Sequence, residues 1–127
     1  MSRFFWICLG GAAGTAARYL LGGWVLATFG AYMPFGTLAV NLIGSFLVGG
    51  IMHVSLATKL IPPTLRLALT TGVLGGFTTY SSFNYEAVKF LQDGAVYLAL
   101  VYVGAMLLGC LAGGFAGLWA GKLLVGG

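Results

Sequence analysis

Residues 70–83 read TTGVLGGFTTYSSF, an apolar run that glycine and hydroxyl residues interrupt. Two adjacent glycines, Gly75 and Gly76, are followed by five hydroxyl-bearing residues in six positions. Glycine lowers helix propensity, and short hydroxyl side chains can bond the backbone groups that a broken helix leaves without partners. The pattern therefore predicts a helix that breaks between Gly75 and Thr79.

The rest of the chain is too apolar for a soluble domain. Of its 127 residues, 60% are hydrophobic and 6% are charged, and the mean hydropathy is +1.02, whereas soluble domains carry about 25% charged residues. A membrane-crossing helix needs about 20 apolar residues. The sequence therefore predicts an all-α membrane protein with one transmembrane domain, residues 1–127, and four transmembrane helices, the third broken near its middle. The expected spans are about 4–29, 36–57, 64–91 and 95–124.

In lipid, a break in a helix is tolerated only where it faces protein or water, and broken helices are where many transporters bind ions. We therefore take the break as the functional centre. Six Lys and Arg residues against two acids give a net charge of +4, which suits a transported anion or anionic lipid. No basic cluster points to nucleic acid. No nucleophile–base pair or metal-ligand spacing points to an enzyme, and Cys8 and Cys110 are isolated in apolar segments.

Two polar features lie within the first two spans. Arg18 would cost at least about 2.5–3.5 kcal/mol in the apolar core unless it snorkels or faces water, so it is either an interfacial anchor or part of an aqueous vestibule. Thr37, Asn41 and Ser45 follow each other at a period of four and share one helix face. The Asn41 amide either bonds across helices or donates to an ion in a pore.

The last two spans carry further candidates. After the break, Thr79, Phe83 and Glu86 lie on related helix faces, although Glu86 is also readable as a solvated end residue. Tyr102 offers a hydroxyl in the fourth span. Small residues at a spacing of four predict close helix packing; they are the pair Gly10 and Gly14 and the stripe Gly109, Gly113, Gly117 and Gly121.

Residues 75–83, GGFTTYSSF, and 36–41, GTLAVN, together with Arg18 and the four spans, resemble the Fluc (CrcB) family of fluoride channels. The resemblance implies a fluoride-selective channel that passively exports cytoplasmic fluoride across the cell inner (plasma) membrane. It also implies an antiparallel, dual-topology homodimer with two pores. A structural sodium ion would be held at the dimer centre by the backbone carbonyls of Gly75 and Thr78.

Fluoride is small and strongly hydrated, so a selective path must replace water with amide and hydroxyl donors, backbone N–H groups and the positive edges of aromatic rings. The family's paired phenylalanines correspond to Tyr80 and Phe83 here. Tyr80 departs from the family pattern, as does Cys110, which stands near a family serine. The expected pore residues are Asn41, Phe83, Tyr80, Thr37, Thr79, Tyr102 and Arg18.

Two alternatives stay open. A proton-coupled small exporter has a similar size but needs a membrane-embedded carboxylate, and Glu86 and Asp93 lie near the end of the third span and in the turn after it. A structural membrane subunit would explain the glycine stripes but not the break. With the N-terminus inside, the basic residues favour one orientation, because Arg3, Lys59, Arg66 and Lys122 would be cytoplasmic and Lys89 would not. Dual topology therefore rests on the resemblance alone.

Overall fold

The computed structural model describes residues 1–126 as four helical stretches joined by short connections. These residues contain no strand. The elements are α1 (Ser2–Phe29), α2 (Phe35–Ala57), α3 (Pro63–Leu67), η1 (Ala68–Leu74), α4 (Gly75–Phe77), α5 (Tyr80–Gln92) and α6 (Val96–Val125). The all-α architecture with a broken third stretch is confirmed, and each expected boundary differs from the observed one by at most two residues.

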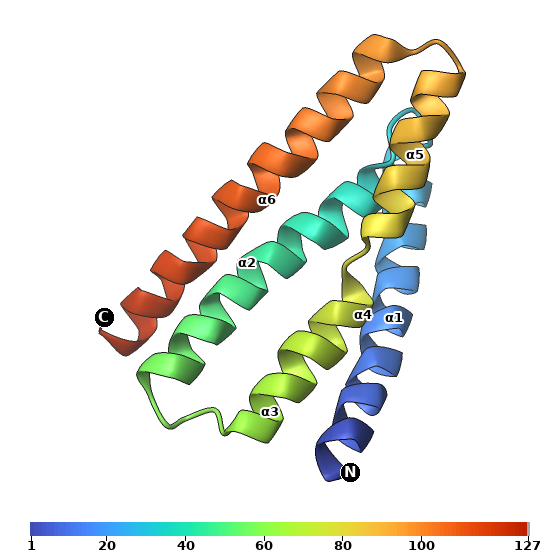
Figure 1. Ribbon diagram of the computed structural model, residues 1–127. Coiled ribbons are helices and arrows are strands. Elements are labelled where there is room, and N and C mark those ends of the chain that lie inside the picture. Colours follow the sequence, from blue (N-terminus) through green and yellow to red (C-terminus); the bar gives the residue numbers. More distant parts are fainter. Residues whose placement is uncertain (127) are drawn as a thin grey trace.

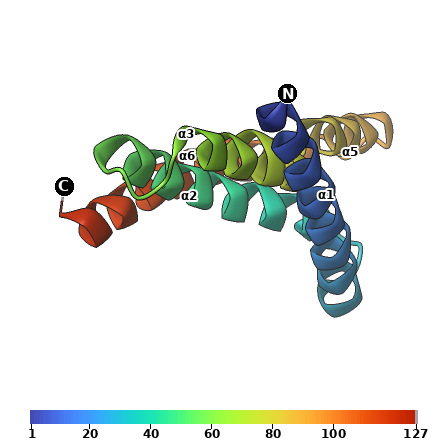
Figure 2. The same ribbon diagram turned by 90° about the horizontal axis from the view of Figure 1, so that it is seen from below.

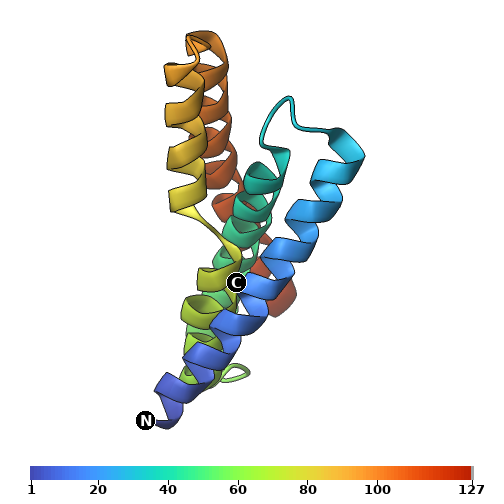
Figure 3. The ribbon, with the colours of Figure 1, turned by 90° about the vertical axis from the view of Figure 1, so that its right-hand side faces the viewer.

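Successive stretches run in opposite directions (Figure 1). α2 packs most extensively against α6, while α1 packs against η1 and α4. α5 lies beside α6, and α1 leans away from this pair (Figure 3). Seen from below, α1 diverges from the row formed by α2, α3 and α6 (Figure 2). The two halves of the third stretch therefore have different neighbours, α1 before the break and α6 after it.

The glycine stripe of α6 is a packing face, as the sequence predicts, and α2 covers it. A methyl group at Gly117 would overlap the Phe46 carbonyl oxygen, and one at Gly121 would lie 3.1 Å from the Gly50 carbonyl oxygen. A methyl group at Gly113 would lie 3.3 Å from the Leu42 carbonyl oxygen, and one at Gly109 would meet the Leu42 side chain. Without Cβ atoms the two backbones approach closely, which is how helices pack in lipid.

The Gly10 and Gly14 pair brings α1 against the third stretch. A methyl group at Gly10 would lie 2.6 Å from the Ala68 carbonyl oxygen, and one at Gly14 would overlap the Val73 carbonyl oxygen. These contacts fall on η1, which is π-helical. Segments of this kind are rare and occur often beside functional sites; here one leads directly into α4 and the break.

The outer surface suits lipid. α1, α2 and α6 are each long and apolar enough to cross a membrane, and the broken stretch runs between the same two ends of the molecule (Figure 1). Large apolar side chains on the outside are mostly exposed, among them Leu20, Leu108 and Phe115. The hydrophobic effect would bury such surface in water, so the chain is a multi-pass membrane protein.

Candidate functional site

The break consists of Thr78 and Thr79, whose backbones are extended (ψ 159° and 121°) between α4 and α5. The N–H and the Oγ1 of Thr78 both donate to the Leu74 carbonyl oxygen, at 3.0 and 2.9 Å. Thr79 Oγ1 accepts from the Ser82 N–H at 3.2 Å and so caps α5. The predicted break is confirmed, and the hydroxyl residues supply backbone partners as expected.

Asn41 of α2 holds the break from the side. Its Oδ1 accepts from the Thr79 N–H at 2.8 Å, and its Nδ2 donates to the Thr79 carbonyl oxygen at 2.9 Å. Nδ2 also contacts Met106 Sδ at 3.3 Å. The amide therefore bonds across helices and satisfies both backbone groups of one residue. Its expected contact with a permeating ion stays a prediction.

The same bonds free two carbonyl groups. In a continuous helix the Gly75 carbonyl would accept from the Thr79 N–H, and the Thr78 carbonyl would accept from the Ser82 N–H. Both N–H groups are instead directed to side-chain oxygens. Gly75 is also exposed. These two carbonyl oxygens therefore lack their helical hydrogen-bond donors. Carbonyl oxygens are the kind of ligand that a hard cation prefers.

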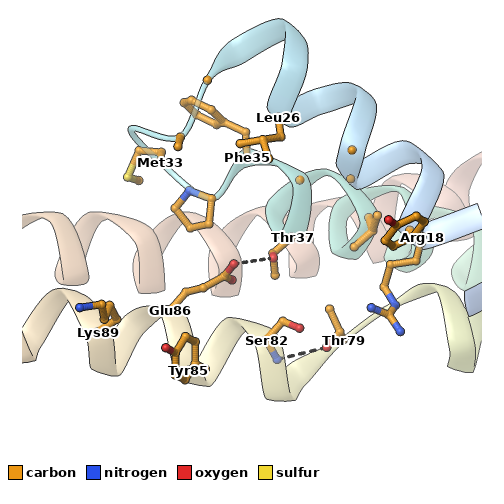
Figure 4. Close-up of a pocket in the computed structure, with 18 of the residues that line it drawn as sticks. Arg18, Leu26, Met33, Phe35, Thr37, Thr79, Ser82, Tyr85, Glu86 and Lys89 are labelled. Carbon is orange, nitrogen blue, oxygen red and sulfur yellow. Dashed lines mark hydrogen bonds between the residues drawn. The ribbon is translucent and has the colours of Figure 1, made fainter.

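A cavity of about 660 Å³ lies above the break, between α1, α2 and α5, and we call it the upper cavity (Figure 4). Arg18, Thr37, Thr79, Ser82 and Glu86 are among the residues that line it. Each of the three helices thus contributes a polar side chain to one space. Of the residues expected from the sequence, the structure brings together Arg18, Thr37 and Thr79 here.

Glu86 is tied into the wall of the upper cavity. Its carboxylate accepts from Thr37 Oγ1 at 3.1 Å and from the Tyr102 hydroxyl at 2.9 Å. The reading of Glu86 as a solvated end residue is therefore wrong. The helical spacing of Glu86 from Thr79 and Phe83 indicates that it shares a face with them. Its hydrogen-bond partners Thr37 and Tyr102, however, lie on other helices, and a single sequence does not identify them.

Arg18 occupies the opposite wall of the upper cavity (Figure 4). Its Nε donates to the Gly76 carbonyl oxygen at 3.0 Å, which satisfies another group freed near the break. Within residues 1–126 the only salt bridge joins Lys89 to Asp93, at 3.3 Å. The guanidinium charge is therefore not neutralised by a direct ion pair, and it makes this wall electropositive.

A second cavity of about 550 Å³, the lower cavity, lies on the other side of the break. Thr79 lines both cavities, so it lies between them. Tyr80 and Phe83 also line the lower cavity, with their ring centroids 5.7 Å apart and their planes at 80°. Phe83 is 7% exposed, whereas Tyr80 is 75% exposed, so only Phe83 is held firmly by its surroundings.

Tyr102 differs from the other candidates, because it is fully buried and lines neither cavity. Its ring packs edge-on against Phe83, at 5.3 Å between centroids, and its hydroxyl bonds Glu86. Tyr102 therefore holds two cavity-lining residues, Phe83 and Glu86, in place without lining a cavity itself. Ser82 and Met106 line the cavities without having been singled out as pore residues. Ser82 could have been found from the capping spacing of Thr79 and Ser82.

Comparisons with known proteins agree with this architecture. The family described as "CrcB-like protein, Camphor Resistance (CrcB)" matches residues 5–118. A relative from Sorangium cellulosum named "Fluoride-specific ion channel FluC" is 50% identical over 127 residues, which cover all of both chains. Relatives with the same name from Anaeromyxobacter dehalogenans and Citrifermentans bemidjiense are 53% and 46% identical, over 91% and 98% of this chain and 92% and 100% of their own. The chain therefore belongs to the CrcB family.

Proposed function

We propose that this protein is a fluoride-selective channel that lets fluoride leave the cytoplasm passively. Relatives about half identical over nearly the whole chain carry the name of a fluoride-specific ion channel. The observation that carries the proposal is the pair of cavities that share Thr79 as a lining residue, in the middle of a broken membrane span. Irregular backbone at membrane depth is tolerated where it lines such a space.

The walls of both cavities offer what an anion needs. Arg18 attracts an anion into the upper cavity, where the Ser82 hydroxyl replaces part of its water, while the Thr37 hydroxyl is directed to Glu86. Thr79 Oγ1 accepts from the Ser82 N–H and lies 3.4 Å from Ser81 Oγ, so it can donate its proton to an anion when Ser81 is the donor of that pair. Beyond Thr79, the edges of the Phe83 and Tyr80 rings present positive charge to the anion. Fluoride therefore exchanges water for fixed donors on both sides of the break.

In this proposal two chains assemble as an antiparallel dimer with a sodium ion at its centre. Support comes from Gly75, which is exposed, and from the carbonyls of Gly75 and Thr78, which lack their helical donors. Four such oxygens from two chains would suit sodium, because hard cations bind oxygen ligands. The dimer should be more stable in sodium than in N-methyl-D-glucamine. Equal stability in the two cations would count against this part of the proposal.

The charges bear on orientation. Arg3, Lys59, Arg66 and Lys122 lie at the end of the molecule that holds the N-terminus, and Lys89 lies at the other end, paired with Asp93 (Figure 1). The positive-inside rule then favours a cytoplasmic N-terminus, so an antiparallel dimer requires some chains to insert against this bias. Labelling Lys59→Cys from outside intact cells, with Cys8 and Cys110 replaced by serine, measures that fraction. Complete protection of the thiol would exclude dual topology.

Fluoride efflux from proteoliposomes, followed with a fluoride electrode, tests the proposal. Wild type should release fluoride down its gradient, faster when the membrane potential is clamped at zero, and should release chloride far more slowly. Release no faster than from empty liposomes would refute the proposal.

The proton-coupled exporter keeps one observation in its favour, because Glu86 is a carboxylate in a cavity wall within the third stretch. Its two hydrogen-bond donors hold it in place, which suits a fixed wall better than a proton carrier. The same liposomes separate the two functions. Efflux driven by an imposed proton gradient and insensitive to voltage would establish the exporter and refute the channel.

A further inference from the structure

Two sulfur atoms lie next to each other on α6, in the wall of the lower cavity. Cys110 Sγ is 3.8 Å from Met106 Sδ, one helical turn away. Met106 is 4% exposed, and its thioether is held by the contact with Asn41 Nδ2 at 3.3 Å. Cys110 is half-buried and lines both the lower cavity and an adjoining cavity of about 690 Å³. A fixed thioether and a reachable thiol therefore share one space.

We propose that Met106 and Cys110 form a binding site for a soft monovalent cation, Cu(I) or Ag(I). Thiolate and thioether sulfur are the ligands that such ions select. Zinc–sulfur bonds in proteins are about 2.3 Å long. With bonds of that length one ion bridges sulfur atoms up to about 4.6 Å apart, so the observed separation is within reach. On binding, the thiol gives its proton to water and a metal–sulfur bond replaces the S–H bond.

The side chains that line the lower cavity suit a soft cation better than a hard one. They include no carboxylate and no imidazole, and apart from the two sulfur atoms the polar ones are hydroxyls and the Asn41 amide. The backbone carbonyls of Gly75 and Thr78, proposed above for sodium, belong to the third stretch and not to α6. Within the described part of the chain, no group of three His, Cys, Asp or Glu side chains is placed to hold a metal. The spacing of the two cysteines likewise predicts no metal site. This site differs because its second ligand is a methionine.

A cation bound there would lie in the same cavity as Tyr80 and Phe83. It would occupy space that the proposed fluoride path uses, and so it would block efflux. The block rests on the proposed function, whereas the binding does not. Without the Cys110 side chain, Met106 would have no thiol beside it. Sensitivity to soft metals is therefore a property of this chain's own sulfur pair.

The test uses silver nitrate in chloride-free buffer, with Cys8→Ala as the parent protein so that Cys110 is its only thiol. Bound silver is measured by equilibrium dialysis and elemental analysis, and efflux is measured in liposomes. The parent should bind silver at one ion per chain and lose fluoride efflux. Adding Cys110→Ser should abolish binding. Adding Met106→Leu, which keeps the volume, should weaken affinity by at least about tenfold, since losing even an outer-shell partner costs that much.

Met33→Leu is the matched control, because Met33 is a buried methionine of the same core cluster but does not line the lower cavity. It should bind silver like the parent. Met106→Leu binding silver as tightly as the parent would overturn the site, because the thiol would then act alone. Silver that binds without reducing fluoride efflux would contradict the proposal that the bound cation blocks the fluoride path. Absent efflux before silver is added would refute the proposed function, while the binding data would still decide the site.

Discussion

Replacing Asn41 with alanine should destabilise the protein through the break. The change removes the partners of the Thr79 N–H, at 2.8 Å, and of the Thr79 carbonyl, at 2.9 Å. A buried backbone group left without a partner costs about 1–3 kcal/mol, so two groups predict a loss of about 2–6 kcal/mol in the free energy of unfolding. The lower end applies if the Thr79 N–H bonds the Gly75 carbonyl again, which would straighten the break.

The Asn41→Asp variant separates the contributions of the two hydrogen bonds between Asn41 and the Thr79 backbone. An ionised carboxylate still accepts from the Thr79 N–H, but it cannot donate to the carbonyl. The free energy of unfolding of the Asp variant should therefore fall by the contribution of the bond to the Thr79 carbonyl, about 1–3 kcal/mol. The variant should also lose fluoride efflux, because it places a negative charge beside the path. Unfolding by SDS in mixed micelles, followed by tryptophan fluorescence, gives the stability, and liposome efflux gives the flux.

Ser45→Ala is the control for Asn41. Ser45 lies one turn further along the same face of α2 and lines the lower cavity.

 Within residues 1–126 the Ser45 hydroxyl forms no hydrogen bond, whereas the Asn41 amide forms two with the Thr79 backbone. Ser45→Ala should therefore change stability by less than about 0.5 kcal/mol, as substitutions away from special contacts do. An Asn41→Ala protein that is as stable as this control and has normal efflux would refute the claim that Asn41 stabilises the break.

Three further changes test other parts of the site. Phe83→Ile keeps an apolar volume but removes the ring edge, so efflux should be lost while the protein still assembles; normal efflux would place the path elsewhere. Tyr102→Phe removes a hydrogen bond to the Glu86 carboxylate, so thermal unfolding should show a loss of about 1.5–3 kcal/mol and efflux should fall; an unchanged melting temperature would contradict the anchoring. Gly117→Ala should separate α2 from α6 and lower the melting temperature, whereas Gly104→Ala, whose added methyl group meets nothing within 4 Å, should not; equal behaviour would refute the close packing.

Much of the fold could be predicted because its signals are local. Span lengths follow from runs of apolar residues, and the break follows from Gly75, Gly76 and the hydroxyl residues after them. The glycine stripe of α6 also predicted a packing face, although not that α2 would cover it. Partners on other helices leave no local signal. This is why two readings stayed open both for Glu86 and for Asn41.

The sequence by itself determined that the chain crosses a membrane, where its spans lie and which of them is broken, because hydropathy and helix propensity act over neighbouring residues. Only the tertiary structure decided which side chains bond the backbone groups freed at the break. Asn41 bonds both the N–H and the carbonyl oxygen of Thr79, and Arg18 donates to the Gly76 carbonyl oxygen. It also placed Glu86 in a cavity wall. In lipid, a backbone group that loses its helical partner finds another within the protein, and helix packing decides which side chain is within reach.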